Sequence, residues 1–270
     1  MTGTERIAAA FEAARGERRA ALMPYLMGGF TDGATSAAVI EAYANAGADL
    51  IELGVPFSDP LADGPVIHAA ATKALSSGAT FTSVLETGKA VSDRVPVIPM
   101  VYANMVLACG ADAYARKLAD EGMAGTIVPD LPPEEAGEVR RALSEHGLAL
   151  IPLIAPTTPP KRRADICRDA TGFIYVVSDT RTTGERDEMP AELGELVRAV
   201  QADASVPAAV GFGIGTPDQA AEVGTVADGV IVGSRLVREV GEAESSEGAA
   251  KAVGAFITAA RHAMSRPAVG

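Results

Sequence analysis

The feature that most constrains the fold is an alternation of short apolar runs with longer amphipathic, alanine-rich stretches. This alternation is typical of βα units arranged around a parallel sheet. The runs expected to form strands cover residues 21–28, 48–54, 96–102, 125–130, 148–155, 172–178, 207–213 and 228–233. Helical patterns cover residues 34–47, 111–122, 133–147, 191–203 and 216–226.

Eight such strands in a chain of 270 residues predict a (β/α)8 TIM barrel. Because no Ser-, Gly- or Pro-rich linker divides the sequence, we expect a single domain over residues 1–270, with its barrel core at about 20–262. The structural alternative is a doubly wound open sheet. That fold predicts a GxGxxG motif after the first strand, where this chain has only Met27-Gly28-Gly29-Phe30.

Composition excludes several classes of protein. The net charge is −12, from 23 Lys and Arg against 35 Asp and Glu, so we expect no nucleic-acid partner. No apolar run approaches the roughly 18 residues of a membrane span, and the polar N-terminus is unlike a signal peptide, so we expect a cytoplasmic protein without membrane contact. No disulfide framework or metal site is expected, because the cysteines and histidines lack the spacing for one: Cys109, Cys167, His68, His146 and His262.

Active sites of TIM barrels lie at the C-terminal ends of the strands. The second strand is unusual because Glu52 interrupts a run that should be apolar on both sides. Alternation places Leu50 and Glu52 on one face and Ile51 and Leu53 on the other, which predicts that Glu52 points into the barrel. Burial there would raise its pKa and suit it to acid and base catalysis near neutral pH. The alternative is a structural ion pair with Lys or Arg at the rim.

Two further features lie at strand ends. The loop 56–65 contains Asp63, which is either a second functional carboxylate or a cap of the helix expected near Pro65. Glycines follow the last three strands, at Thr183-Gly184, Gly211–Gly215 and Gly233-Ser234. In this fold phosphate groups bind there, at backbone amides and a helix N-terminus, so a phosphorylated small molecule is the expected substrate. The alternative for each glycine is ordinary punctuation at a strand end.

The segment from Leu50 to Pro65, LIELGVPFSDPLADGP, resembles the signature of the tryptophan synthase alpha chain family. Further matching motifs occur in the family's order along nearly the whole chain: 24–26, 102–104, 129–132, 211–214 and 227–234. The resemblance implies a (β/α)8 lyase of tryptophan biosynthesis that cleaves indole-3-glycerol phosphate to indole and glyceraldehyde 3-phosphate. It implies no cofactor and no metal. It also implies a pyridoxal-phosphate-dependent beta chain as partner, in an alpha2beta2 heterotetramer.

The resemblance also implies roles for individual residues. Glu52 matches the glutamate that protonates indole C3 and takes the hydroxyl proton, and Asp63 matches the aspartate that accepts the indole N–H and stabilises the developing charge. The residues that correspond to the substrate-binding set are Tyr25, Met100, Tyr102, Ile127, Leu153, Tyr175, Thr183 and Phe212. The residues that correspond to the phosphate-binding set are Gly184, Gly213, Gly233 and Ser234.

The sequence departs from the family pattern mainly in the loop 179–187. Asp179 and Arg181 stand where the family usually has arginine and glycine, and His68 replaces a common glutamine. Two functions remain open besides that of an alpha subunit, and the altered loop favours keeping the first of them. One is a stand-alone lyase that releases free indole for another pathway, and the other is a non-catalytic, allosteric alpha-like subunit. The presence of Glu52 and Asp63 disfavours the non-catalytic alternative.

Overall fold

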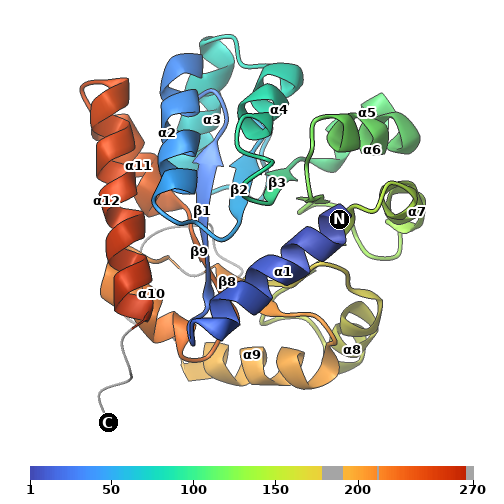
Figure 1. Ribbon diagram of the computed structural model, residues 1–270. Coiled ribbons are helices and arrows are strands. Elements are labelled where there is room, and N and C mark those ends of the chain that lie inside the picture. The colour runs from blue at the N-terminus through green and yellow to red at the C-terminus, as the bar shows by residue number, and fades with distance from the viewer. Residues whose placement is uncertain (178–190, 212, 266–270) are drawn as a thin grey trace.

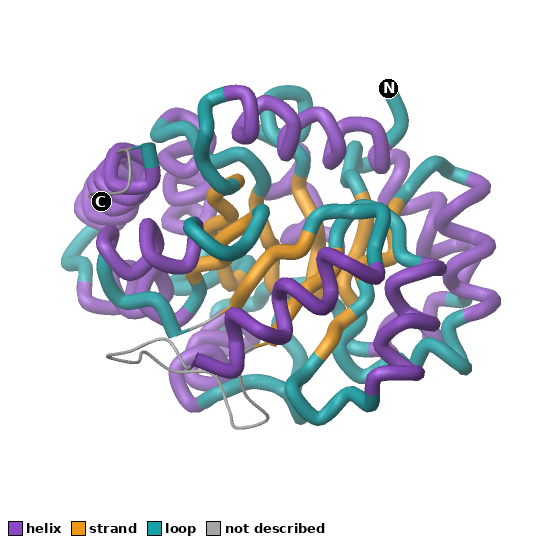
Figure 2. The backbone as a smooth tube through the Cα atoms, turned by 90° about the horizontal axis from the view of Figure 1, so that it is seen from below, coloured by secondary structure: helices purple, strands orange, loops and turns teal. Residues whose placement is uncertain are grey.

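The strands of the protein form a parallel barrel surrounded by helices (Figures 1 and 2). The computed structural model describes residues 1–177, 191–211 and 213–265. The strands within these ranges are β1 (Ala21–Met27), β2 (Ile51–Gly54), β3 (Val97–Met100), β4 (Gly125–Ile127), β5 (Ala149–Ile151), β6 (Leu153–Ile154), β7 (Ile174–Val177), β8 (Ala208–Gly211) and β9 (Gly229–Val232). Their order is β5-β4-β3-β2-β1-β9-β8-β7-β6, which confirms the expected barrel.

The barrel closes at Pro152, where the structure differs from the expected single strand 148–155. On one side β5 pairs with β4, and on the other β6 pairs with β7, so the two edges of the sheet are consecutive pieces of chain. Proline has no N–H to donate to a ladder, which interrupts the strand. Its carbonyl still accepts the Tyr175 N–H at 2.9 Å, and this bond joins the segment to β7.

Helices cover the outside of the barrel (Figure 2). Those described are α1 (Gly3–Gly16), α2 (Gly33–Asn45), α3 (Pro65–Ser76), α4 (Phe81–Lys89), α5 (Ala103–Cys109), α6 (Ala111–Asp120), α7 (Gly137–Glu145), α8 (Pro160–Asp169), α9 (Ala191–Asp203), α10 (Pro217–Gly224), α11 (Ser234–Glu242) and α12 (Ser246–Met264). Helix α7 begins four residues later than the predicted start at 133, because residues 133–136 form turns after consecutive prolines. Among these helices none is both long and apolar enough to span a membrane.

The core has two layers, as expected for a sheet whose alternate residues face in opposite directions. Ile51 and Leu53 pack in the outer layer between sheet and helices, whereas Leu50 packs in the barrel interior. Helix α1, which precedes the predicted barrel core, adds Ile7 and Phe11 to the interior cluster and lies across the barrel in Figure 1. The N-terminal end of the barrel is therefore filled by apolar side chains, which leaves the opposite end for a binding site.

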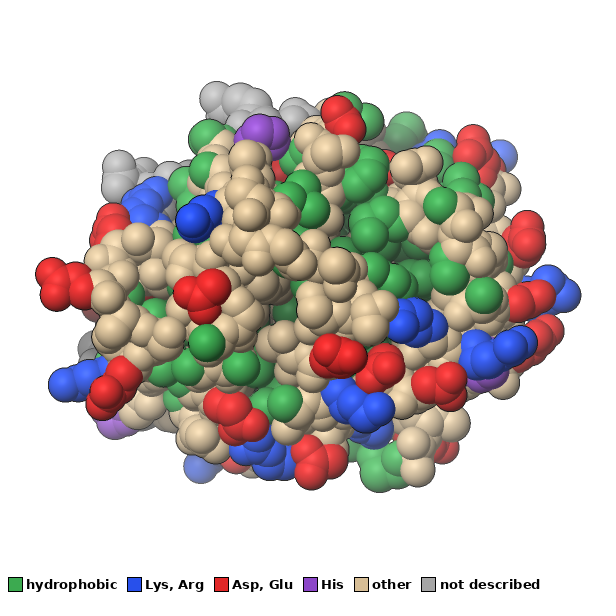
Figure 3. Space-filling view, turned by 90° about the horizontal axis from the view of Figure 1, so that it is seen from above, with side chains coloured by type: hydrophobic (Ala, Val, Ile, Leu, Met, Phe, Trp, Pro, Cys, Tyr) green, Lys and Arg blue, Asp and Glu red, His purple; other side chains and the backbone are tan. Residues whose placement is uncertain are grey.

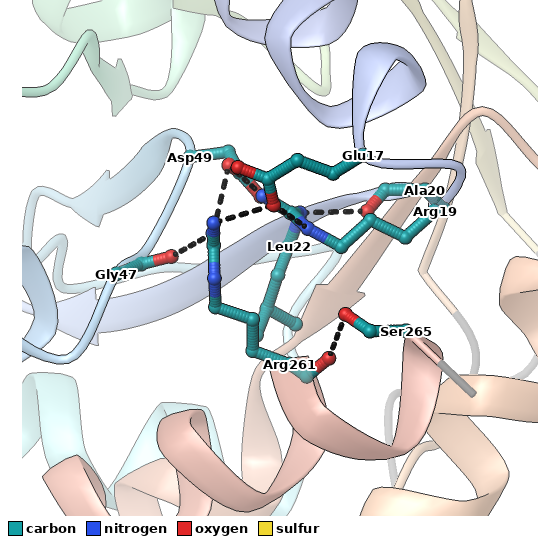
Figure 4. A network of polar contacts seen from close by, with 8 residues as sticks. All are labelled: Glu17, Arg19, Ala20, Leu22, Gly47, Asp49, Arg261 and Ser265. Carbon is teal, nitrogen blue, oxygen red and sulfur yellow. Dashed lines mark hydrogen bonds and ion pairs between the residues drawn. The ribbon is translucent and has the colours of Figure 1, made fainter.

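A polar network centred on the buried side chain of Arg19 joins α1, β1, β2 and α12 at this N-terminal end (Figure 4). The guanidinium of Arg19 donates to both carboxylate oxygens of Asp49, which also accepts the Leu22 N–H at 2.7 Å. Arg261 of α12 donates to Asp49 at 3.3 Å and to Glu17 at 2.6 Å. Because every buried charge in this network has a partner, the network fixes the position of α12 without leaving an unpaired ion.

The surface carries charges of both signs. On the face drawn in Figure 3, acidic and basic side chains are interspersed around a hollowed stretch of hydrophobic ones. A surface that binds a nucleic-acid backbone would instead gather Lys and Arg into one patch. Within the described residues of that face, the two charges are mixed.

Candidate active site

Glu52 lies on β2 with its side chain on the interior face, as the alternation predicts. Only 4% of the residue is exposed, and its Oε2 atom has no hydrogen-bond partner. Burial raises the pKa of Glu52 to about 8, and the nearby charge of Asp63 adds to this rise. Among the described residues Glu52 has no Lys or Arg partner, so the ion-pair alternative finds no support there.

Asp63 is held at the rim by contacts of its loop with Tyr102. The ring of Phe57 stacks on that of Tyr102 at 5.2 Å, and the Ala62 N–H donates to the Tyr102 hydroxyl at 3.0 Å. This hydroxyl in turn donates to the Asp63 carboxylate. Helix α3 has Gly64 as its N-cap and no side-chain cap, so the structure does not support the capping alternative for Asp63.

The two carboxyl groups have different environments. Burial raises the pKa of Asp63, but the hydrogen bond from Tyr102 and the charge of His68 oppose this rise. For Glu52, burial and the charge of Asp63 act in the same direction. Two neighbouring carboxyl groups whose surroundings separate their pKa values can divide the acid and base roles of a reaction.

Two tyrosines adjoin these carboxyl groups, of which Tyr25 is buried and Tyr175 partly buried. Tyr25 on β1 pairs in register with Glu52, and burial together with the charges of Asp63 and Glu52 raises its pKa well above the usual value. The same causes raise the pKa of Tyr175 on β7. Each hydroxyl lies over a glycine of the neighbouring strand, Gly54 for Tyr25 and Gly211 for Tyr175, where any Cβ would collide with it. Gly211 therefore makes room for a tyrosine.

Apolar side chains from successive strands lie at the same level of the barrel. Met100 pairs in register with Ile127, and Leu153 pairs with Tyr175. All four belong to, or pack against, the interior cluster. This arrangement forms an apolar wall on the interior face of the barrel. Thr183, Gly184 and Phe212 fall outside the described residues.

The predicted phosphate residues Gly233 and Ser234 lie where β9 ends and α11 begins. Gly233 is the N-cap of α11, and Ser234 is its buried first residue. The N–H groups of a first helical turn have no partner within the helix and favour an anion. Gly213 lies in the segment after β8, the strand next to β9. The structure therefore brings two strand ends with glycines side by side.

Comparison with known proteins identifies the family. A sequence model of the tryptophan synthase alpha chain matches residues 11–265. The chain belongs to the tryptophan synthase alpha chain family. It is 44% identical to the tryptophan synthase alpha chain of Synechococcus sp. (strain CC9902), with 95% of this chain and 96% of that protein aligned. For the Carboxydothermus hydrogenoformans alpha chain the identity is 46%, over 86% of this chain and 88% of that protein.

Solved structures of the family share this fold. A structure of Mycobacterium tuberculosis tryptophan synthase superposes with a TM-score of 0.90 at 37% identity, covering 97% of this chain and 99% of that chain. The tryptophan synthase subunit alpha from Legionella pneumophila str. Paris gives 0.84 at 36% identity, covering 96% and 98%. The fold and the order of its elements are therefore those of tryptophan synthase alpha chains.

The structure also shows features of this alpha chain that the sequence pattern did not. A cavity of about 960 Å³ lies between the segment after β4 and helix α8; Leu153 and Val177 line it, whereas Glu52 and Asp63 do not. Gly54 lies beneath the hydroxyl of Tyr25, and its only signal in the sequence is that a glycine ends β2. The charge of His68 acts on Asp63, and its only signal is that it replaces a common glutamine. No cluster of three or more potential metal ligands occurs among the residues described.

Proposed function

We propose that this alpha chain is an indole-3-glycerol-phosphate lyase of tryptophan biosynthesis that releases indole and glyceraldehyde 3-phosphate. The observation that carries the proposal is the environment of Glu52, a buried carboxyl group on the catalytic face of the barrel, without an ion partner among the described residues and with a pKa of about 8. Such a group is largely protonated at neutral pH and can both give and take a proton. Family membership supports a lyase, and the residues support this particular cleavage.

The cleavage needs two proton movements and one broken bond. Glu52 gives its proton to indole C3, which yields an indolenine. The Glu52 carboxylate then takes the proton of the side-chain hydroxyl next to C3, and the bond between C3 and that carbon breaks. The bonding electrons return to the ring, while the carbon with the hydroxyl becomes the aldehyde of glyceraldehyde 3-phosphate. Glu52 is protonated again at the end, so one carboxyl group completes the cycle.

Asp63 supplies the second carboxylate. Protonation at C3 places positive charge on the ring nitrogen, and an ionised Asp63 that accepts the ring N–H stabilises this charge. Its hydrogen bond from Tyr102 and its more exposed position favour ionisation at a pH where Glu52 is still protonated. The two carboxyl groups then act in opposite protonation states, as this chemistry requires.

The remaining site residues bind the two ends of the substrate. We assign the apolar wall formed by Met100, Ile127 and Leu153 to the indole ring. Tyr25 pairs in register with Glu52, Tyr175 pairs with Leu153 of this wall, and the charges of both carboxyl groups act on both tyrosines. We assign the phosphate to Gly213, Gly233 and Ser234, where backbone N–H groups and the N-terminus of α11 favour an anion.

The test of this activity is the conversion of indole-3-glycerol phosphate by the purified chain, with both products quantified. We expect indole and glyceraldehyde 3-phosphate in equal amounts and without added metal or cofactor. No turnover, alone or with a beta chain, would instead favour a non-catalytic alpha-like subunit.

We also propose a tryptophan synthase beta chain as partner. Large apolar side chains are exposed on two neighbouring segments of the catalytic face. Leu61 is 86% exposed and lies in the loop that contacts Tyr102. Leu107 is 67% exposed and lies on α5, which follows Tyr102. Exposed apolar side chains close together are typical of a protein interface. The Mycobacterium tuberculosis neighbour is a structure of a tryptophan synthase.

The partner is tested by measuring indole release with and without added beta chain. We expect activation by at least about tenfold, because closure and completion of such sites often limit turnover. Leu107→Lys should weaken the activation, whereas Leu75→Lys on α3, 38% exposed, is the matched control and should not. A high rate that no beta chain increases would favour the stand-alone lyase, whose distinguishing loop 179–187 lies outside the described residues.

A further inference from the structure

Asp63 has a histidine for a neighbour across the first turn of helix α3. Gly64 is the N-cap of this helix, so Asp63 immediately precedes the cap and His68 is the fourth helical residue. The His68 N–H donates to the Gly64 carbonyl at 2.9 Å, which closes the first turn. Side chains at these two positions meet in the arrangement known, for apolar residues, as the hydrophobic staple. These positions bring the imidazole near enough for its charge to act on the carboxyl group of Asp63.

Among the residues that the structure describes, the other groups that act on Asp63 carry no positive charge. They are Glu52 on β2, Tyr25 on β1, Tyr102 after β3 and Tyr175 on β7. Tyr102 donates a hydrogen bond to Asp63, but it is neutral at physiological pH. Within the part of the chain that the structure describes, His68 is thus the cationic group that acts on Asp63.

Position and charge together indicate a role for this histidine. We propose that His68 is a positioning residue that keeps Asp63 ionised as the pH falls and so sets the acidic limit of the pH range in which the site works. Histidine is the side chain whose charge ordinarily changes within the physiological pH range. The charge of the imidazolium favours the ionised form of Asp63, and His68 itself is exposed. This inference rests on the catalytic role proposed for Asp63.

The test compares the wild type with His68→Gln, which keeps a polar side chain of similar reach but cannot become charged. The matched control is His262→Gln, since His262 is also exposed and lies in the last turn of α12, at the opposite end of the barrel. For each protein kcat/KM is measured from pH 5 to pH 9. At the acidic end of this range we expect kcat/KM of His68→Gln to fall below the wild-type value by up to about threefold, because one unit charge several ångströms away in a partly exposed site has at most about this effect.

At pH 8.5 the ratio between His68→Gln and wild type should return toward one, and His262→Gln should follow the wild type at every pH. A constant ratio at all pH values would overturn the inference, because a merely structural effect of the substitution does not depend on the charge of an imidazole. A second measurement needs no activity: the titration of the Asp63 carboxyl carbon by NMR in the unliganded protein. Its midpoint should rise in His68→Gln alone, and an unchanged midpoint would refute the inference even if the proposed function is correct.

Discussion

Replacement of Glu52 by glutamine should stabilise the protein at neutral pH. In the folded protein the pKa of Glu52 is about 8 against an ordinary value of 4.5, so between these two values the folded state binds a proton that the unfolded state has lost. Stability therefore falls as the pH rises through this window. At pH 7, which is 2.5 units above 4.5, keeping Glu52 protonated in the folded state lowers the free energy of unfolding by about 3 kcal/mol. Glutamine has a similar shape and no charge, and so removes this cost.

Urea unfolding of wild type and Glu52→Gln at pH 5, 7 and 8 measures the effect. At pH 5 the difference in unfolding free energy should be below about 1 kcal/mol, and it should grow to about 3 kcal/mol at pH 7. Glu86→Gln, at an exposed glutamate on α4, is the matched control and should change stability little at any pH. A stability difference that is the same at pH 5 and pH 8 would refute the reasoning, because it would mean that burial does not perturb Glu52.

Two further substitutions separate binding from chemistry. Asp63→Asn should lower kcat by about 10² while KM changes little, because the charge that Asp63 stabilises develops only during the reaction. A thermal midpoint that falls while kcat stays normal would instead support a capping role. Gly233→Val should raise KM by about tenfold, because a side chain there keeps a phosphate away from backbone N–H groups. Among the described residues a Cβ at this position would meet Tyr25 Cβ at 3.8 Å, an ordinary van der Waals contact, and the thermal midpoint of the variant shows whether it is folded. An unchanged KM in a folded variant would remove the phosphate from Gly233.

Much of the barrel could be predicted from the sequence because its strands are short apolar runs with clear boundaries. The division of 148–155 into two strands was not predicted, since Pro152 lies within an otherwise continuous apolar run and its effect depends on which neighbours pair on each side. The role of α1 was missed for another reason. Its Ile7 and Phe11 fill the end of the barrel, but a helix before the first strand has no fixed place in the βα pattern.

In the site, too, a local sequence pattern predicts some features, whereas others depend on contacts between segments that are distant in the sequence. The inward direction of Glu52 follows from alternation along a single strand, so the sequence is sufficient to predict it. The hydrogen bond between Tyr102 and Asp63 joins two loops, and no spacing along the chain reveals it. Likewise, Gly54 has the appearance of strand punctuation until the hydroxyl of Tyr25 is found above it.

The central claim is that Glu52 carries the proton through the cleavage of indole-3-glycerol phosphate. The most direct test is the turnover number of Glu52→Gln with saturating substrate at pH 7.5, with indole release followed for the wild type and the variant side by side. Because glutamine preserves the shape of the site but cannot cycle a proton, the account predicts a loss of at least about 10² in kcat, with the variant folded and at least as stable as the wild type. A variant that turns over within a few-fold of the wild type would contradict the claim.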